Sequence, residues 1–151
     1  MSLIREASKE SIGMRGWVTV AVCGMVMALS LAAAAGEAPP PEYAKSMRAI
    51  NDAAGSLQEN IDKLDWTGVA KDAASLRKLS VPAEEFWQKR KVDDAIQLSK
   101  ALRKAAADLE TAAKAMDEAG VKTASKGLTV ACNGCHKLHR ERTPDAKFMI
   151  K

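Results

Sequence analysis

Apolar residues recur every three or four positions from residue 42 to residue 142, with polar and charged residues between them. This spacing puts the apolar side chains on one face of a helix. It predicts four amphipathic helices, at about residues 42–64, 66–79, 93–119 and 121–142. In the first helix the apolar steps alternate between four and three residues, which is a heptad pattern. The residues of this seam are Tyr43, Met47, Ile50, Ala54, Leu57, Ile61 and Leu64.

Short polar stretches and prolines separate these helices. Either Asp65 or Thr67 can cap the second helix. Pro82 is expected to end that helix, because the residue before a proline avoids the helical conformation. Gly120 is expected to end the third helix, and the tail after Pro144 is expected to be irregular. Four amphipathic helices with short connections predict an all-α fold, an antiparallel up-down-up-down four-helix bundle.

Composition supports the all-helical prediction. Apolar residues make up 47% of the chain and aromatic residues only 4%, so alanine supplies much of the apolar content. Alanine is the best helix former and lets helices approach closely. The body of the sequence has no cluster of the β-branched and aromatic residues that favour strands. Phe86 and Trp87 are expected to cover one end of the core.

The first 35 residues have the pattern of a secretion signal, with three basic residues followed by an uncharged run that ends in alanines. The run has 19 residues, which also reaches the minimum for a membrane-spanning helix, so an uncleaved anchor stays open. We divide the chain into a signal peptide at 1–35, a proline-rich lead-in at 36–41, a helical domain at 42–142 and a tail at 143–151. The predicted location is the periplasm, and the protein meets a membrane only if the leader is not cleaved.

The charges nearly balance. The chain has 23 basic and 19 acidic residues, and removal of the leader would leave 20 against 17. This balance gives no argument for nucleic acid as a partner. The basic run Lys89-Arg90-Lys91 is expected to be a solvated face, or a docking patch for an acidic redox partner.

The stretch that carries chemistry is Cys132-Asn133-Gly134-Cys135-His136. Two thiols at this spacing can each add across a vinyl group of haem, and the adjacent imidazole can then bind the iron. At about 100° per residue, the three positions lie within about 60° of arc on one helix face. Asn133 and Gly134 are small, which would let the macrocycle lie close to the backbone. The motif predicts one covalent haem c per chain, held by Cys132 and Cys135, with His136 as the proximal ligand.

Two other interpretations of the cysteines stay open. A thiol–disulfide redox pair normally opens a helix that follows a strand, and the pattern predicts no strand here. A zinc site can use Cys132, Cys135 and either His136 or His139, but no fourth ligand lies close in sequence. The third cysteine, Cys23, lies in the predicted signal peptide and is interpreted as an inert apolar residue.

The second axial position must be filled from another helix, because His139 lies one turn from His136 on the same face. In an up-down-up-down bundle the first and fourth helices are antiparallel neighbours, so the start of one lies beside the end of the other. Met47 lies near the start of the first helix on its apolar seam and is the predicted distal ligand, although such a methionine can also be core filler. Met116 is expected at the far end of the bundle. Met149, in the tail, is a less favoured candidate that would have to fold back.

Residues 42–142 resemble the cytochrome c-prime family, including its low-spin members in which a methionine binds the iron. The resemblance rests on the motif at 132–136 in the last of four helices, on Met47 in the first helix, and on Arg140 four residues after the histidine. It implies that Arg140 lies beside the proximal histidine, where it would tune or shield the haem.

The chain departs from this family at two positions. It has His139 where members often have tyrosine. It has Tyr43 where members often have a basic residue that pairs with a haem propionate, so Lys45 or Arg48 would have to take that role. The family analogy also suggests a homodimer, paired through the first two helices.

These residues predict an exported monohaem c-type cytochrome that carries single electrons between redox partner proteins. Methionine and histidine ligands raise the haem potential and keep the iron closed to small ligands. The sequence shows no paired carboxylates or nucleophile–base set in one predicted cleft, so we expect no enzyme. Two alternatives stay open: a five-coordinate gas-binding cytochrome, in which Met47 only packs, and a non-haem zinc-binding helical module.

Overall fold

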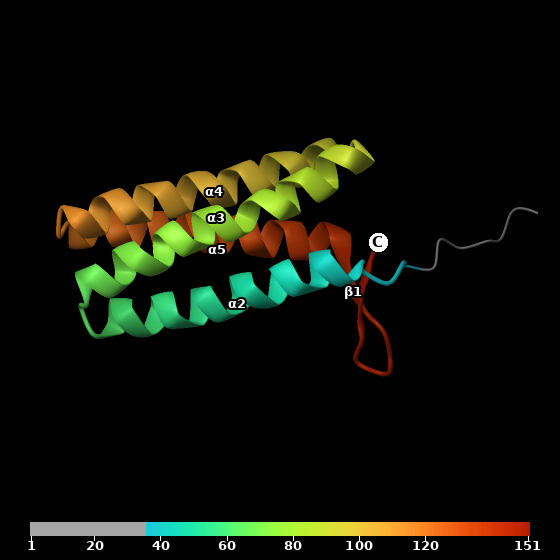
Figure 1. Ribbon diagram of the computed structural model, residues 1–151, viewed down its shortest axis with the longest axis horizontal. Helices are drawn as coiled ribbons and strands as arrows, with labels where there is room; N and C mark the ends of the chain where they lie inside the picture. The colour runs from blue at the N-terminus through green and yellow to red at the C-terminus, as the bar shows by residue number, and fades with distance from the viewer. Residues whose placement is uncertain (1–35) are drawn as a thin grey trace, which may run out of the picture. The chain divides into compact units, whose positions relative to one another are not determined.

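The computed structural model describes residues 36–151, which form a helical bundle and a short C-terminal hairpin (Figure 1). The predicted signal peptide, with Cys23, lies outside the described residues. No helix within residues 36–151 is long and apolar enough to cross a membrane. The elements are α2 (Pro41–Asp62), α3 (Trp66–Arg90), α4 (Asp93–Lys114), α5 (Glu118–His139), β1 (Arg140–Arg142) and β2 (Phe148–Ile150).

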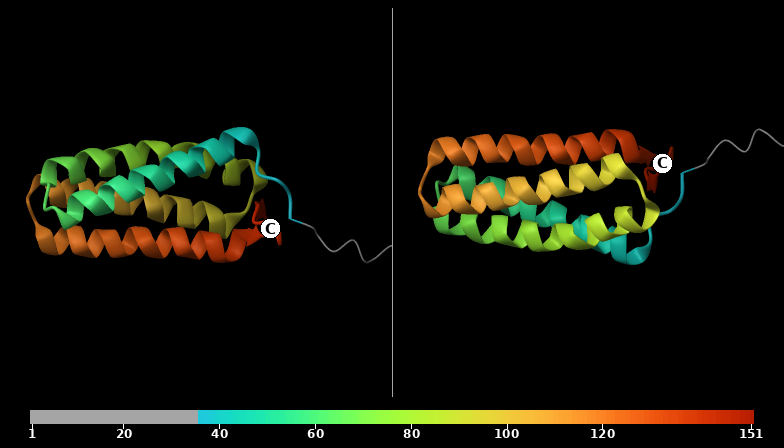
Figure 2. Two further views of the ribbon diagram at one scale, coloured as in Figure 1. Left: turned by 90° about the horizontal axis from the view of Figure 1, so that it is seen from below. Right: turned by 90° about the horizontal axis from the view of Figure 1, so that it is seen from above.

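Successive helices run in opposite directions and lie side by side (Figure 2). Short turns join α2 to α3, α3 to α4 and α4 to α5, and each of these pairs is closely packed. This arrangement is an up-down-up-down four-helix bundle, so the predicted fold class is confirmed. The first and last helices, α2 and α5, make far fewer close backbone contacts with each other than these three pairs do. The bundle is therefore loosest between α2 and α5.

The core follows the apolar seams that the sequence predicts. Val69, Leu76, Leu109 and Val121 are almost completely buried, one or more from each of α3, α4 and α5. Burying a leucine or valine side chain contributes about 1.5–3 kcal/mol. Small residues between them let the helices approach closely. These buried alanines are Ala73, Ala83, Ala95, Ala105, Ala106, Ala113, Ala124 and Ala131.

The helix α3 continues through Pro82, so the prediction that Pro82 ends the second helix is wrong. An interior proline costs about 3 kcal/mol or more, because it removes one backbone N–H donor and crowds the preceding turn. Ala83 and Trp87, only 3% and 2% exposed, extend the buried stripe of α3 beyond the proline. The Ser80 hydroxyl also donates to the Arg77 carbonyl at 2.9 Å within this turn. Burial of the last two turns outweighs the local preference of the proline.

Aspartates set the starts of α3 and α5. The prediction that Gly120 ends the third helix is wrong, since α4 ends at Lys114 and Gly120 lies in the first turn of α5. The Asp117 carboxylate caps α5 by accepting a hydrogen bond from the Gly120 N–H at 3.0 Å. Asp65 caps α3 in the same way, through the Gly68 N–H at 3.0 Å. Each carboxylate satisfies a free N–H and faces the positive end of the helix dipole.

Each turn between two helices holds a non-glycine residue in the left-handed region: Leu64, Lys91 and Met116, with φ of 56°, 56° and 53°. Met116 is 71% exposed, so its side chain adds little packing. Met116→Gly removes the Cβ that disfavours this conformation, and we expect the free energy of unfolding in urea to rise by about 0.5–1 kcal/mol. Met116→Ala keeps a Cβ at the same φ and serves as the control. An equal gain in both variants would show that backbone strain at Met116 is not the cause.

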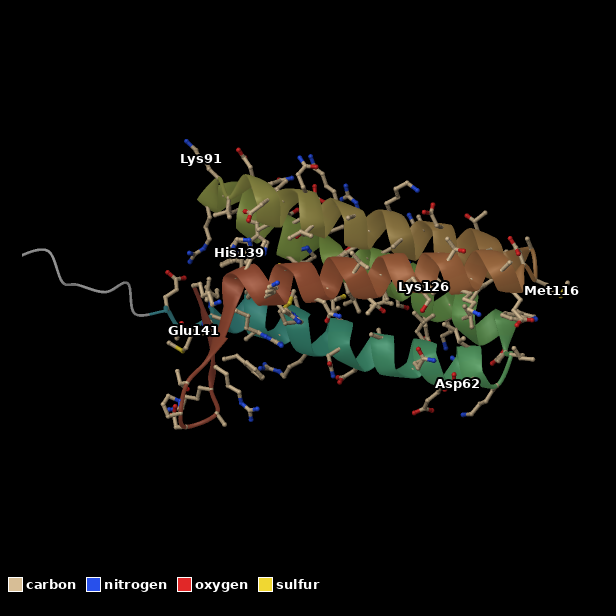
Figure 3. All side chains as sticks on the ribbon, turned by 180° about the vertical axis from the view of Figure 1, so that it is seen from behind. Asp62, Lys91, Met116, Lys126, His139 and Glu141 are labelled. Atoms are coloured by element: carbon tan, nitrogen blue, oxygen red, sulfur yellow. The ribbon has the colours of Figure 1, made fainter. Side chains whose placement is uncertain are left out.

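The C-terminal tail is ordered, and the prediction that it is irregular is wrong. The helix α5 ends at His139, and β1 then pairs antiparallel with β2. Glu37 exchanges two backbone hydrogen bonds with Ile150, both at 2.8 Å. Ile150 is 4% exposed and packs in a small cluster with Trp87 and Ala95. This long-range burial fixes the hairpin at the end of the bundle, where Figure 3 shows His139 and Glu141 near Lys91 and far from Met116.

Candidate functional site

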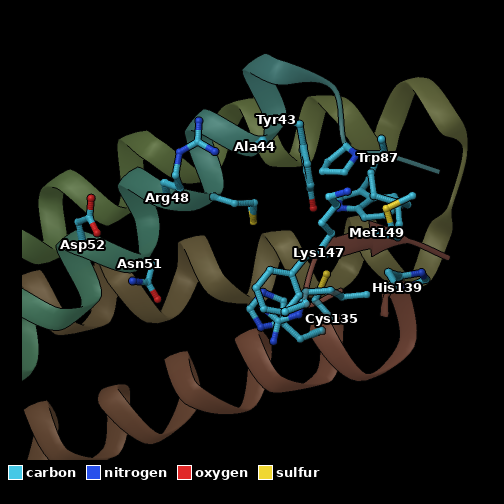
Figure 4. A pocket seen from close by; sticks show the side chains of 18 residues that line it. Tyr43, Ala44, Arg48, Asn51, Asp52, Trp87, Cys135, His139, Lys147 and Met149 are labelled. Atoms are coloured by element: carbon cyan, nitrogen blue, oxygen red, sulfur yellow. The ribbon is translucent and has the colours of Figure 1, made fainter. Parts of the chain in front are cut away.

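A cavity of about 680 Å³ lies between the first turns of α2 and the last turns of α5. Tyr43 and Met47 line it from α2, and Cys135 and His136 line it from α5. Figure 4 shows Tyr43 and Cys135 pointing into the space between the two helices. Trp87 of α3 lines it as well. The cavity occupies the side of the bundle where the two helices are not closely packed.

A second cavity of about 380 Å³ adjoins the first and reaches deeper along α2, α4 and α5. Met47, Cys135 and His136 line both cavities, and Cys132 lines the deeper one. The structure thus brings the motif and Met47, about 85 residues apart in sequence, to one continuous space. The local sequence around Met47 or around the motif does not bring them together. Their closeness follows from the antiparallel arrangement of α2 and α5.

The motif lies entirely on α5, so Cys132, Cys135 and His136 share one face of that helix. All three are partly buried, and both thiols are free. Gly134 also lies close to α4. A Cβ at Gly134 would lie 3.0 Å from the Leu98 Cδ2 atom, so its small size lets α5 approach α4.

Both thiols are held in their protonated form. Burial raises the pKa of Cys132. Burial, followed by the neighbouring Cys132 and Asp94 charges, raises the pKa of Cys135 to about 11. Redox-active and metal-binding cysteines instead depend on a lowered thiol pKa. The strands of the hairpin also follow the motif and do not precede it, so the site lacks the features of a thiol–disulfide redox pair.

The imidazole of His136 is held neutral. Burial, followed by the positive charge of Arg140, lowers its pKa below the ordinary value of 6.5. A neutral imidazole is the form that binds a metal ion. Arg140, four residues after His136, is the first residue of β1 and lines both cavities. Its guanidinium carbon lies 4.5 Å from the centroid of the Phe148 ring.

Met47 faces these groups from the opposite side of the cavities, partly buried against the core. One turn earlier, burial and then the Cys135 charge raise the pKa of Tyr43 to about 12, so this phenol stays protonated. Met116 lies in the turn after α4, at the far end of the bundle, as expected. Met149, on β2, lines the larger cavity because the hairpin folds back. The described residues therefore offer two cavity-lining methionines, of which only Met47 reaches both cavities.

His139 forms part of the cavity wall and is held by its neighbours. Its Nε2 lies 3.1 Å from the Asp94 Oδ2 atom, and its ring lies 5.0 Å from that of Trp87. Its side chain is only 13% exposed. Within residues 36–151 no three His, Cys, Asp or Glu side chains are grouped closely enough to hold a metal ion.

Sequence reasoning missed the contribution of the hairpin to this site. Phe148, Met149 and Ile150 line the larger cavity, although they follow the motif by more than ten residues. The available signal was the apolar run Phe148-Met149-Ile150 after a proline-containing turn, which is typical of a short strand. All three residues of its partner strand β1 are charged, so no apolar alternation marks that strand.

Comparison with known protein families gives a match. The family whose description is Cytochrome C' matches residues 45–140, which include Met47, the motif and Arg140. No curated protein and no solved structure matches the chain.

Proposed function

The chain belongs to the cytochrome c′ family, and from this premise we propose that it is an exported monohaem c-type cytochrome that carries single electrons between redox partner proteins. Membership implies a covalently bound haem c and redox partners at a general level. The single-electron role, the periplasmic location and the individual ligands are our proposal.

The residues around the two cavities fit this group. Cys132 and Cys135 are free thiols on one helix face, which suits attachment at two points. His136 is a neutral imidazole beside them, and the walls are mainly apolar and aromatic, as expected for a large apolar cofactor. When bound, haem c supplies an iron that gains or loses one electron.

The observation that carries the proposal is that Met47 and His136 line the same two cavities from different helices. The thioether of Met47 and the imidazole of His136 would both be available to bind the iron. This ligand pair raises the haem potential and leaves no open position for a small molecule. It therefore favours electron transfer over gas binding.

The other cavity residues position and shield the group. Trp87, which is 2% exposed, and Tyr43 line both cavities and would shield part of the group from water. Arg48 and Arg140 line the same cavity, and their positive charges could pair with the carboxylates of a bound haem. In this proposal Arg140 binds or shields the cofactor, and Arg48 replaces the basic residue that relatives carry near position 43.

A mediated spectroelectrochemical titration tests this function. We expect one fully reversible one-electron step and a low-spin spectrum that carbon monoxide does not change. Rapid binding of carbon monoxide to the reduced protein would instead support the gas-binding cytochrome. Absence of covalent haem, after expression in a host competent in haem attachment, would leave only a non-haem helical module.

A further inference from the structure

The C-terminal hairpin is strongly basic and extends beyond the part of the chain that matches the family, which ends at residue 140. It carries four basic and two acidic residues between positions 140 and 151. Glu141 accepts a hydrogen bond from the Gly36 N–H at 3.1 Å, and Asp145 pairs with Lys147 at 2.7 Å, so Arg140 and Arg142 supply most of the excess positive charge. The exposed basic residues between positions 137 and 151 are Lys137, Arg140, Arg142, Lys147 and Lys151. This end of the molecule therefore presents a positive surface to solvent.

An aromatic ring lies within this positive surface. Phe148 is 48% exposed. The guanidinium carbons of Arg140 and Arg142 lie 4.5 and 5.7 Å from the centre of its ring. Arginines stacked on an exposed aromatic ring are typical of the central residues of protein interfaces, where they contribute most of the binding energy.

The hairpin is held in place before any partner binds. Besides the β1–β2 ladder, Glu37 and Ile150 exchange two backbone hydrogen bonds at 2.8 Å, and the Ile150 side chain is buried against Trp87. Lys151 also donates from its Nζ to the Lys137 carbonyl at 3.2 Å. A surface fixed in this way loses little conformational freedom on binding.

The positive surface is continuous with the cavity. Arg140, Lys147 and Phe148 line the larger cavity together with Cys135 and His136, while Arg142 lines neither cavity. A protein seated on the outer side of the hairpin would therefore lie against the wall of the proposed cofactor site. Electron transfer between proteins requires this kind of close approach.

We infer that Arg140, Arg142 and Phe148, the hairpin surface, form the docking site for an acidic redox protein. The inference rests on the proposed electron-transfer function and names its partner surface. Charge complementarity selects an acidic partner and speeds its encounter. An anionic membrane would also be attracted, but a single exposed aromatic ring gives little apolar area to insert.

Charge reversal on the hairpin tests the inference. Arg142→Glu is compared with Lys126→Glu, which makes the same charge change at an exposed position in the first half of α5, away from the hairpin (Figure 3). The probe is a reduced, acidic [2Fe–2S] ferredoxin mixed with the ferric protein in a stopped-flow instrument. One electron passes from each reduced cluster to one ferric iron, and no bond changes. At low ionic strength, Arg142→Glu should lower the second-order rate constant about threefold to tenfold, and Lys126→Glu should change it much less.

Three controls keep the test decisive. The difference between the two variants should vanish near 1 M salt, where charges are screened beyond about 3 Å. Arg142→Gln should give an intermediate rate, and it replaces the charge-reversal variant if that one does not fold. Arg142→Glu and Lys126→Glu should both keep the wild-type midpoint potential in a mediated titration. If wild type itself shows no reversible titration, the proposed function fails, whatever the hairpin does.

Equal slowing of both charge-reversal variants would mean that only net charge matters, and would overturn the docking site. So would an unchanged rate in Arg142→Glu. A third contrary result is loss of binding to phosphatidylglycerol vesicles in Arg142→Glu with an unaltered ferredoxin rate, which would assign the surface to a membrane.

Discussion

The double variant Cys132→Ala/Cys135→Ala is expected to mature without covalently bound haem. Both attachment points lie on one face of α5 and are free thiols in the structure, and the described residues hold no other cysteine. Without them the cavity of about 680 Å³ can hold haem only through non-covalent contacts and bonds to the iron, and acid extraction removes haem held in this way. The measurement is the intact mass of the purified protein, together with its visible absorption after extraction with acidified organic solvent.

The matched control is Cys23→Ala, the same substitution at the cysteine of the predicted signal peptide. This variant should keep covalent haem at the wild-type level. Each single variant, Cys132→Ala or Cys135→Ala, should keep one attachment point and show a shifted absorption band. Covalent haem in the double variant would mean that the motif is not the attachment site.

Met47→Leu is expected to convert a low-spin, six-coordinate iron to a high-spin, five-coordinate one. Leucine keeps the size and apolar character of the side chain, so the packing of α2 against the core should survive. It removes the thioether sulfur, and the midpoint potential should fall by about 0.1 V, because axial ligation tunes haem potentials over a range of about 0.8 V. The reduced variant should then bind carbon monoxide, and visible spectra with and without carbon monoxide measure both effects.

Met149→Leu is the matched control for this prediction, because Met149 lines the larger cavity from the hairpin. It should leave the spectrum and the potential unchanged. The reverse pattern, with a spectral change in Met149→Leu alone, would move the distal ligand to the hairpin. If the wild-type spectrum is already high-spin and neither variant changes it, the iron is five-coordinate and the gas-binding alternative gains support.

Local chemistry explains why much of the site could be predicted. Cys132, Cys135 and His136 share a face because of helix geometry alone, so their spacing in the sequence is sufficient. Placing Met47 opposite them needed one further step, the antiparallel order of four helices, and the structure brings all four residues to one space. Their roles as ligands stay predictions until the variants above are measured.

The errors have a common physical origin in burial that the local sequence does not reveal. Pro82 looked like a helix end because its local cost is clear, whereas the compensating burial of Trp87 depends on helices far away in sequence. Gly120 looked like a helix end because glycine often is, whereas the Asp117 carboxylate fixed a different boundary. The hairpin is held in place by backbone hydrogen bonds between Ile150 and Glu37, which lies more than a hundred residues earlier in the chain.

The sequence by itself determined the four helices, the all-α bundle and the face that carries the motif, because each depends on a periodicity that repeats within one segment. Only the tertiary structure decided how far α3 runs, which residues close the cavity, and that a basic hairpin stands beside it. Those features depend on which distant surfaces bury one another. Their free energy is set by contacts such as that of Ile150 with Trp87, which no local pattern encodes.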